Sequence, residues 1–219
     1  MIRLRGYWLR ESVRQCWQVA AGVLFLMVFI SASAAAEEEA KRFDLSAAYL
    51  YSIPIGEEES GTNWSDLYEN GQGALLEFAY RVTPHFALYA GTAYHQYHGK
   101  ELTFGSETGR FNDQTLLSLY AGIKAYLLAP ELPQKAGGIN PYLRVDIGAT
   151  QYNGAAFNGA SVADRSVQFA YSVGVGADLL TYTSFIFFLE AKYEDHGTPD
   201  KAGSSFRAVP IAIGVRYLM

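Results

Sequence analysis

The chain has 219 residues and a formal net charge of −5, which is enough for one domain or at most two. Half of the residues are hydrophobic, yet beyond the N-terminal segment no run of about 18 strongly apolar residues occurs, so a helical membrane protein is not expected. The chain contains 16 Tyr, 13 Phe and 21 Gly, a composition that favours β-strands and tight turns.

The first 36 residues predict a secretory signal peptide. Four arginines precede an apolar segment from Val19 to Ile30, and small residues follow it. Cleavage is expected after Ala36, with Ala34 as the alternative site. A retained N-terminal anchor helix is the other interpretation, but the strongly apolar part is short for a membrane span.

The mature chain is expected to be acidic and free of cysteine. Of the 17 basic and 22 acidic residues, four Arg and one Glu lie in residues 1–36, which leaves 13 basic and 21 acidic, a net −8. This charge argues against nucleic acid as a partner, because phosphate binding needs clustered Lys and Arg. The single cysteine, Cys16, precedes the apolar segment, so neither a disulfide nor a thiol nucleophile is expected.

Eight segments with alternating apolar and polar residues follow the signal peptide. Each has about ten residues or slightly more, the length that a tilted strand needs to cross a bilayer. The sequence therefore predicts an all-β fold, an eight-stranded antiparallel up-and-down transmembrane β-barrel over residues 43–219, after a short periplasmic segment at 37–42. The segments are 43–53, 73–83, 86–96, 115–127, 141–152, 166–179, 185–194 and 206–219.

Charged residues recur on the second, polar face of these segments. Near the bilayer midplane each would cost about 2–4 kcal/mol if it faced lipid, so we expect all of them to point into the lumen and to pair there. An eight-stranded barrel is narrow enough for its own side chains to fill, so this network is expected to be a plug rather than an ion pathway. The predicted lumen residues are Glu77, Arg81, Lys124, Arg144, Asp146, Asp178, Glu190, Lys192 and Arg216.

The connections between segments alternate in length, which separates this prediction from a soluble β-sandwich. Residues 54–72, 97–114, 153–165 and 195–205 form long connections, whereas Pro84-His85 and residues 180–184 are tight turns. The fourth connection, at 128–140, is longer than usual for a turn but contains Pro and Gly, as a turn would. Long loops at one end and short turns at the other are typical of outer-membrane barrels. The strands are also long for a soluble sandwich, and aromatic residues fall near both predicted membrane boundaries.

The C-terminus resembles the last-strand signal of outer-membrane proteins. Gly214, Tyr217 and Met219 fill its glycine and hydrophobic positions, although the usual terminal residue is Phe. With the signal peptide and the eight segments, the chain resembles the small OmpA-like and opacity-type outer-membrane β-barrel family. The resemblance implies location in the cell outer membrane, contact with lipid and lipopolysaccharide, and passage through periplasmic chaperones and the barrel-assembly machinery. It implies neither a cofactor nor an oligomeric state.

Three groups of residues could carry chemistry. His95, His98 and Glu101 could bind a metal, but solvated loop positions are the preferred interpretation, because no further ligand is close in sequence. The acidic first loop has no regular spacing of calcium ligands. Serine and histidine types for a lipid-modifying enzyme are present at His95, Ser106, His196, Ser204 and Ser205, without a recognisable active-site spacing.

We therefore expect a non-enzymatic barrel, with neither catalytic nor metal residues, that contributes to envelope integrity or presents its loops for surface contacts. One alternative is an enzyme that modifies lipid A or phospholipid at the membrane rim. A further alternative is a narrow pore for small or hydrophobic solutes.

Overall fold

A computed structural model describes residues 43–57, 62–104, 107–128, 138–179, 184–200 and 203–219. The predicted signal peptide and the segment at 37–42 lie outside these residues. No helix among the described residues has the length and apolarity to cross a membrane.

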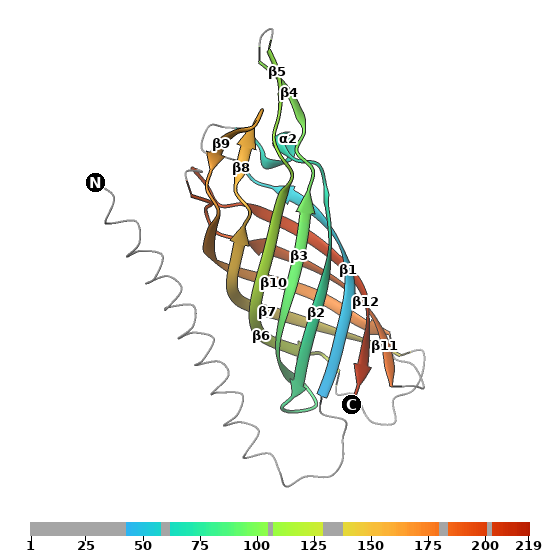
Figure 1. Ribbon diagram of the computed structural model, residues 1–219. Coiled ribbons are helices and arrows are strands. Elements are labelled where there is room, and N and C mark those ends of the chain that lie inside the picture. Colours follow the sequence, from blue (N-terminus) through green and yellow to red (C-terminus); the bar gives the residue numbers. More distant parts are fainter. Residues whose placement is uncertain (1–42, 58–61, 105–106, 129–137, 180–183, 201–202) are drawn as a thin grey trace, which may run out of the picture. The chain divides into compact units, whose positions relative to one another are not determined.

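Eight long strands form one closed antiparallel barrel, in the order β1-β12-β11-β10-β7-β6-β3-β2 (Figure 1). The first strand pairs with the last from Asp44 opposite Leu218 to Ile55 opposite Arg207, so the barrel has no free edge. The strands are β1 (Phe43–Ile55), β2 (Gly71–Arg81), β3 (Phe86–Tyr97), β6 (Gln114–Tyr126), β7 (Ile139–Tyr152), β10 (Ser166–Leu179), β11 (Phe185–Asp195) and β12 (Arg207–Leu218). The predicted number of strands and their order are confirmed.

The distribution of apolar and charged side chains over the two faces of the strands is the reverse of that in a soluble protein. Large apolar side chains point outward, and Leu119 and Ile213 are 64% and 63% exposed. Charged side chains point inward, and Asp178 and Arg216 are fully buried. Because the sheet closes on itself and the apolar face is the outer one, the soluble-sandwich interpretation is wrong.

The register between neighbouring strands matches tyrosines to glycines inside the barrel. Tyr89 on β3 lies opposite Gly122 on β6, and two positions further along Gly91 lies opposite Tyr120. A Cβ atom on Gly122 would lie 2.7 Å from the Tyr89 hydroxyl, and one on Gly91 2.8 Å from the Tyr120 hydroxyl. Each ring therefore occupies the space that the missing side chain of its partner leaves.

The two ends of the barrel differ. At one end, here called the turn end, β2 and β3 are joined by the short turn at Pro84, and β1 begins and β12 finishes. The other, here called the loop end, carries the short helix α2 (Trp64–Leu67), the hairpin of β4 (Glu101–Phe104) and β5 (Glu107–Arg110), and the hairpin of β8 (Ala155–Phe157) and β9 (Ala160–Ala163). In Figure 1 the β4–β5 hairpin projects from the loop end.

The sequence pattern predicts only loop where α2, the β4–β5 hairpin and the β8–β9 hairpin lie. Alternation over three or four residues is too brief to distinguish a strand from a loop.

Candidate functional site

The inside of the barrel is filled by charged and aromatic side chains. Of the nine charged residues predicted to face the lumen, eight are buried there: Glu77, Lys124, Arg144, Asp146, Asp178, Glu190, Lys192 and Arg216. The ninth, Arg81, is only partly buried at the turn end, where its guanidinium lies 4.9 Å from the centre of the Tyr126 ring.

Arg144 is the centre of the largest ion-pair cluster. Its guanidinium lies 2.8 Å from an oxygen of Glu190, 3.1 Å from one of Glu77 and 2.8 Å from one of Asp146. Lys124 forms a second ion pair with Glu77. Three carboxylates from β2, β7 and β11 thus meet one guanidinium, which connects opposite parts of the barrel wall through its interior.

A second cluster lies around Arg216 on β12. The guanidinium pairs with Asp178 on β10 and lies 3.4 Å from Asp44 on β1. It also donates hydrogen bonds to Ser46 and to the Tyr126 hydroxyl. Asp44 was not among the predicted lumen charges, although its place on the polar face of the first segment could have identified it.

The third cluster, nearest the loop end, consists of His95 on β3, Glu194 on β11 and His196 just after β11. Glu194 Oε2 lies 3.5 Å from His95 Nε2 and 3.2 Å from His196 Nε2, and its other oxygen is 2.6 Å from Lys192 Nζ. All three residues are buried. The interpretation of His95 as a solvated loop residue is therefore wrong, because His95 lies within β3 with its ring buried on the inner face of the barrel.

The other members of the expected metal group lie elsewhere. His98 Nδ1 is 2.8 Å from Asp113 at the base of the β4–β5 hairpin, and Glu101 is exposed on β4. The partners of His95 come instead from β11, far along the chain. Only the closure of the barrel brings these residues together, so no sequence spacing could have revealed the cluster.

Aromatic rings pack above the His–Glu–His cluster and close the lumen at the loop end. Trp64 and Tyr68, in and just after α2, contact Phe206, and the Tyr97 ring lies 5.0 Å from the Phe206 ring. The Trp64 indole donates a hydrogen bond to the Ser205 carbonyl. Burial in this aromatic cap raises the pKa of Tyr68 to about 12.

The serines considered for catalysis have other partners. Ser204 donates to the Glu57 carbonyl, and Ser205 donates to Asp195. Ser106 lies outside the described residues. Nδ1 of His196 contacts Thr150 and its Nε2 contacts Glu194, so the geometry does not join His196 to either described candidate nucleophile.

The interior carries more negative than positive charge. Asp195, also buried, is paired with the partly exposed Arg207 at the loop end. The remaining buried charges among the described residues are six carboxylates, Asp44, Glu77, Asp146, Asp178, Glu190 and Glu194, and four cations, Lys124, Arg144, Lys192 and Arg216. The difference is two negative charges, with both histidines counted as neutral.

Comparison with known proteins identifies the family. The sequence model described as "outer membrane protein beta-barrel domain" matches residues 21–217. The chain belongs to this family. The predicted resemblance and the predicted outer-membrane location are thereby confirmed.

Several solved outer-membrane proteins share the fold. OprG from Pseudomonas aeruginosa is 16% identical, with 83% of this chain and 97% of that chain covered and a TM-score of 0.57. Neisserial surface protein A is 17% identical, with 84% and 100% covered and a TM-score of 0.53. Ail of Yersinia pestis is 13% identical, with 81% and 98% covered and a TM-score of 0.51. No curated protein sequence matches the chain.

Proposed function

We propose that this family member is a non-enzymatic barrel that acts through surface contacts made by its loop end. The observation that carries the proposal is a set of contacts between the described residues of different loops, above a filled lumen. In this proposal the loop end faces the outside of the cell, because outer-membrane barrels have long extracellular loops and short periplasmic turns.

Contacts between the loops support the view that they form one binding surface. The Phe111 and Phe157 rings, from different connections, lie 5.1 Å apart. The Arg110 backbone amide donates to the Asn158 side chain, and Lys100 donates to the Ser65 carbonyl in α2. Such cross-loop bonds fix the relative positions of the hairpins and lower the entropy that a partner must remove on binding.

The filled lumen supports a contact role over a pore. Arg144 and its three carboxylates occupy the centre of the barrel, and the aromatic cap lies above them. The name of one similar structure, the attachment invasion locus protein Ail, also refers to attachment, although that likeness concerns the fold.

We further propose that residues 1–36 are removed on export and that Gly214, Tyr217 and Met219 are read by the barrel-assembly machinery. The mass of the protein purified from outer membranes tests the first part, since cleavage after Ala34 or Ala36 gives distinct masses. Met219→Phe tests the second, because it restores the usual terminal residue and should maintain or increase the amount assembled.

The surface role is tested with a deletion strain that carries either the intact chain or a variant in which residues 101–110 are replaced by a two-residue Asn-Gly turn. Adhesion of the cells to immobilised matrix proteins and to each other is measured. The shortened variant should assemble normally and adhere like the deletion strain. Full adhesion by this variant would contradict a role for the hairpin.

The alternatives have their own readouts in the same strains. A change in lipid A or phospholipid composition on deletion would favour the rim enzyme. Loss of uptake of small or hydrophobic solutes, with adhesion unchanged, would favour the pore.

A further inference from the structure

We propose that the His95, Glu194 and His196 cluster is a binding site for one divalent transition-metal ion of the zinc type, held inside the lumen. Two imidazoles and one carboxylate are ligands that zinc accepts, and three protein ligands leave a fourth position for water. This inference does not depend on the proposed surface role.

The geometry of the three ligand atoms fits one small ion. His95, Glu194 and His196 each offer one ligand atom, and the three atoms lie within 4.8 Å of one another. In a tetrahedral site with metal–ligand bonds of about 2.0–2.1 Å, neighbouring ligand atoms are about 3.3 Å apart. Glu194 Oε2 is already 3.5 Å and 3.2 Å from the two imidazole nitrogens, so only the two rings need to approach each other.

The histidine nitrogens lack the partners that buried imidazoles normally have. His95 is fully buried, and neither of its ring nitrogens has a hydrogen-bond partner. His196 Nε2 likewise has none apart from the ion-pair contact with Glu194. A buried polar atom without a partner is costly, and a metal ion would satisfy one nitrogen of each ring together with the carboxylate.

One tautomer of His196 offers the nitrogen that a metal needs. Nδ1 of His196 is 3.1 Å from Thr150 Oγ1, which is 2.7 Å from Ser118 Oγ. When Nδ1–H donates to Thr150, Nε2 is left unprotonated and faces Glu194. Orientation of a ligating imidazole through its other nitrogen is typical of metal sites.

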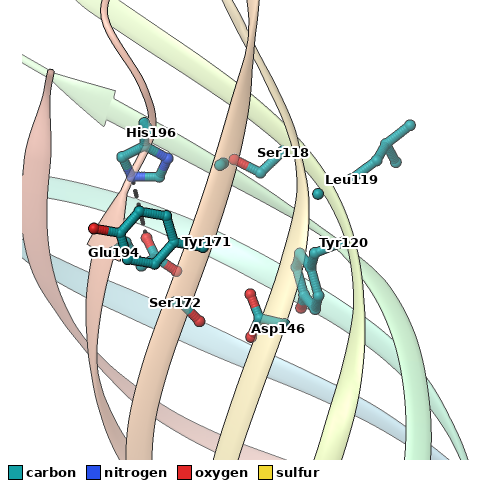
Figure 2. A pocket seen from close by; sticks show the side chains of 10 residues that line it. Ser118, Leu119, Tyr120, Asp146, Tyr171, Ser172, Glu194 and His196 are labelled. Atoms are coloured by element: carbon teal, nitrogen blue, oxygen red, sulfur yellow. Dashed lines mark ion pairs between the residues drawn. The ribbon is translucent and has the colours of Figure 1, made fainter. Parts of the chain in front are cut away.

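A cavity beside the cluster has room for the fourth ligand. Its volume is about 20 Å³, which suits one water molecule, and Ser118, Ser172, Glu194 and His196 are among the residues that line it. Figure 2 shows His196 and Glu194 joined on one side of this space, with Ser118, Ser172 and Asp146 around it.

The interior charge is compatible with a bound cation. The buried carboxylates exceed the buried cations by two, and the partly buried Arg81 adds one positive charge at the turn end. Lys192 pairs with Glu194, but it also interacts with Asp146 and Glu190, so its charge is shared with the central cluster. Because the aromatic cap covers the site, we expect the ion to enter during folding rather than afterwards.

The test uses the mature protein, treated with a chelator, unfolded and refolded in detergent with Co²⁺, whose visible spectrum reports coordination. We expect one Co²⁺ per barrel, with the intense bands of a tetrahedral site, and displacement by Zn²⁺. His95→Gln and His196→Gln should abolish stoichiometric binding, whereas His98→Ala, which removes an imidazole outside the lumen, should leave it unchanged. The gel shift between unheated and heated samples verifies that each variant is folded.

Thr150→Val keeps all three ligands and is the second variant, in case loss of a histidine prevents folding. It should weaken Co²⁺ binding by about 10–100-fold, because it removes only the group that orients His196. The proposal is overturned if folded wild-type protein binds no Co²⁺ or Zn²⁺. It is equally overturned if binding is lost in His98→Ala, or if nitrogen NMR finds His95 and His196 doubly protonated in protein that excludes the metal.

Discussion

Arg144 shows how strongly a single residue can determine the stability of the barrel. Its replacement by Met leaves Glu77, Asp146 and Glu190 close together with less positive charge among them. Removal of one partner from a buried ion pair costs about 3–5 kcal/mol, so we expect a loss of that size in the free energy of unfolding. Urea titration, followed by the gel shift of unheated samples, measures it.

The matched control is Arg207→Met at the loop end. Arg207 pairs with Asp195, but its side chain is 46% exposed, and exposed ion pairs contribute about 0–1 kcal/mol. Equal losses in the two variants would contradict the view that the lumen cluster is the main electrostatic constraint.

Ile213 tests which face of β12 meets lipid. It is exposed on the outer face between Tyr49 on β1 and Leu189 on β11. Ile213→Arg should destabilise the barrel by about 2–4 kcal/mol if the site is near the midplane. Gly174→Arg should instead prevent correct packing, because even a Cβ there would lie 2.7 Å from Lys192 Cγ. Equilibrium refolding into lipid vesicles measures the free energy of unfolding of Ile213→Arg and the fraction of Gly174→Arg that folds.

A fluorophore gives an independent check of the faces. At position 147, where Ile147 is half exposed, a quencher in the lipid chains should reduce its emission strongly. At position 146, where Asp146 is buried, it should not. The reverse pattern would mean that the two faces of β7 have been exchanged.

At the scale of elements, Asp113 holds the base of the β4–β5 hairpin. Partial burial alone would raise the pKa of its carboxyl, but hydrogen bonds with His98, Gly99 and Gln96 outweigh this and lower the pKa below 3.8. Because the pKa of Asp113 is lower in the folded than in the unfolded chain, the ionised carboxylate stabilises the hairpin base above pH 3.8. This stabilisation is lost as the pH falls through the pKa of the folded protein. Carbon NMR of the Asp113 carboxyl should therefore give a midpoint below 3.8.

His98→Ala should move this midpoint upward, because it removes both a hydrogen bond and a nearby positive charge. An unchanged midpoint would mean that Gly99 and Gln96 keep the pKa of the carboxyl low without His98.

The same elements show what sequence alone can predict. The eight barrel strands were predictable because a charge such as Asp146 or Arg216 must face inward, and one such residue fixes the phase of its whole strand. The hairpins at the loop end were not, because their stability comes from contacts between loops, such as Phe111 with Phe157. The pairing of His95 with Glu194 was also hidden, since the alternation of each strand gives its faces but not its neighbour across the lumen.

At the scale of the whole molecule, closure predicts resistance to detergent. The β1–β12 pairing leaves no strand edge from which unfolding can start. Unheated protein should therefore migrate differently from heated protein on a denaturing gel, and it should have a β-type circular dichroism spectrum in detergent. Identical migration with no β spectrum would contradict the closed barrel.

The tyrosine–glycine matches inside the wall have a consequence for how this protein can diverge. The alignment of β3 with β6 is set by residues of the strands themselves, namely the pairs Tyr89–Gly122 and Tyr120–Gly91. The pair Tyr142–Gly176 does the same for β7 and β10. A shift by one residue would remove every such match. Since alignment is specified within the wall, the hairpins at the loop end are free to change in length and sequence without altering the scaffold. Selection can therefore act on the hairpins at the loop end while the barrel wall stays constant.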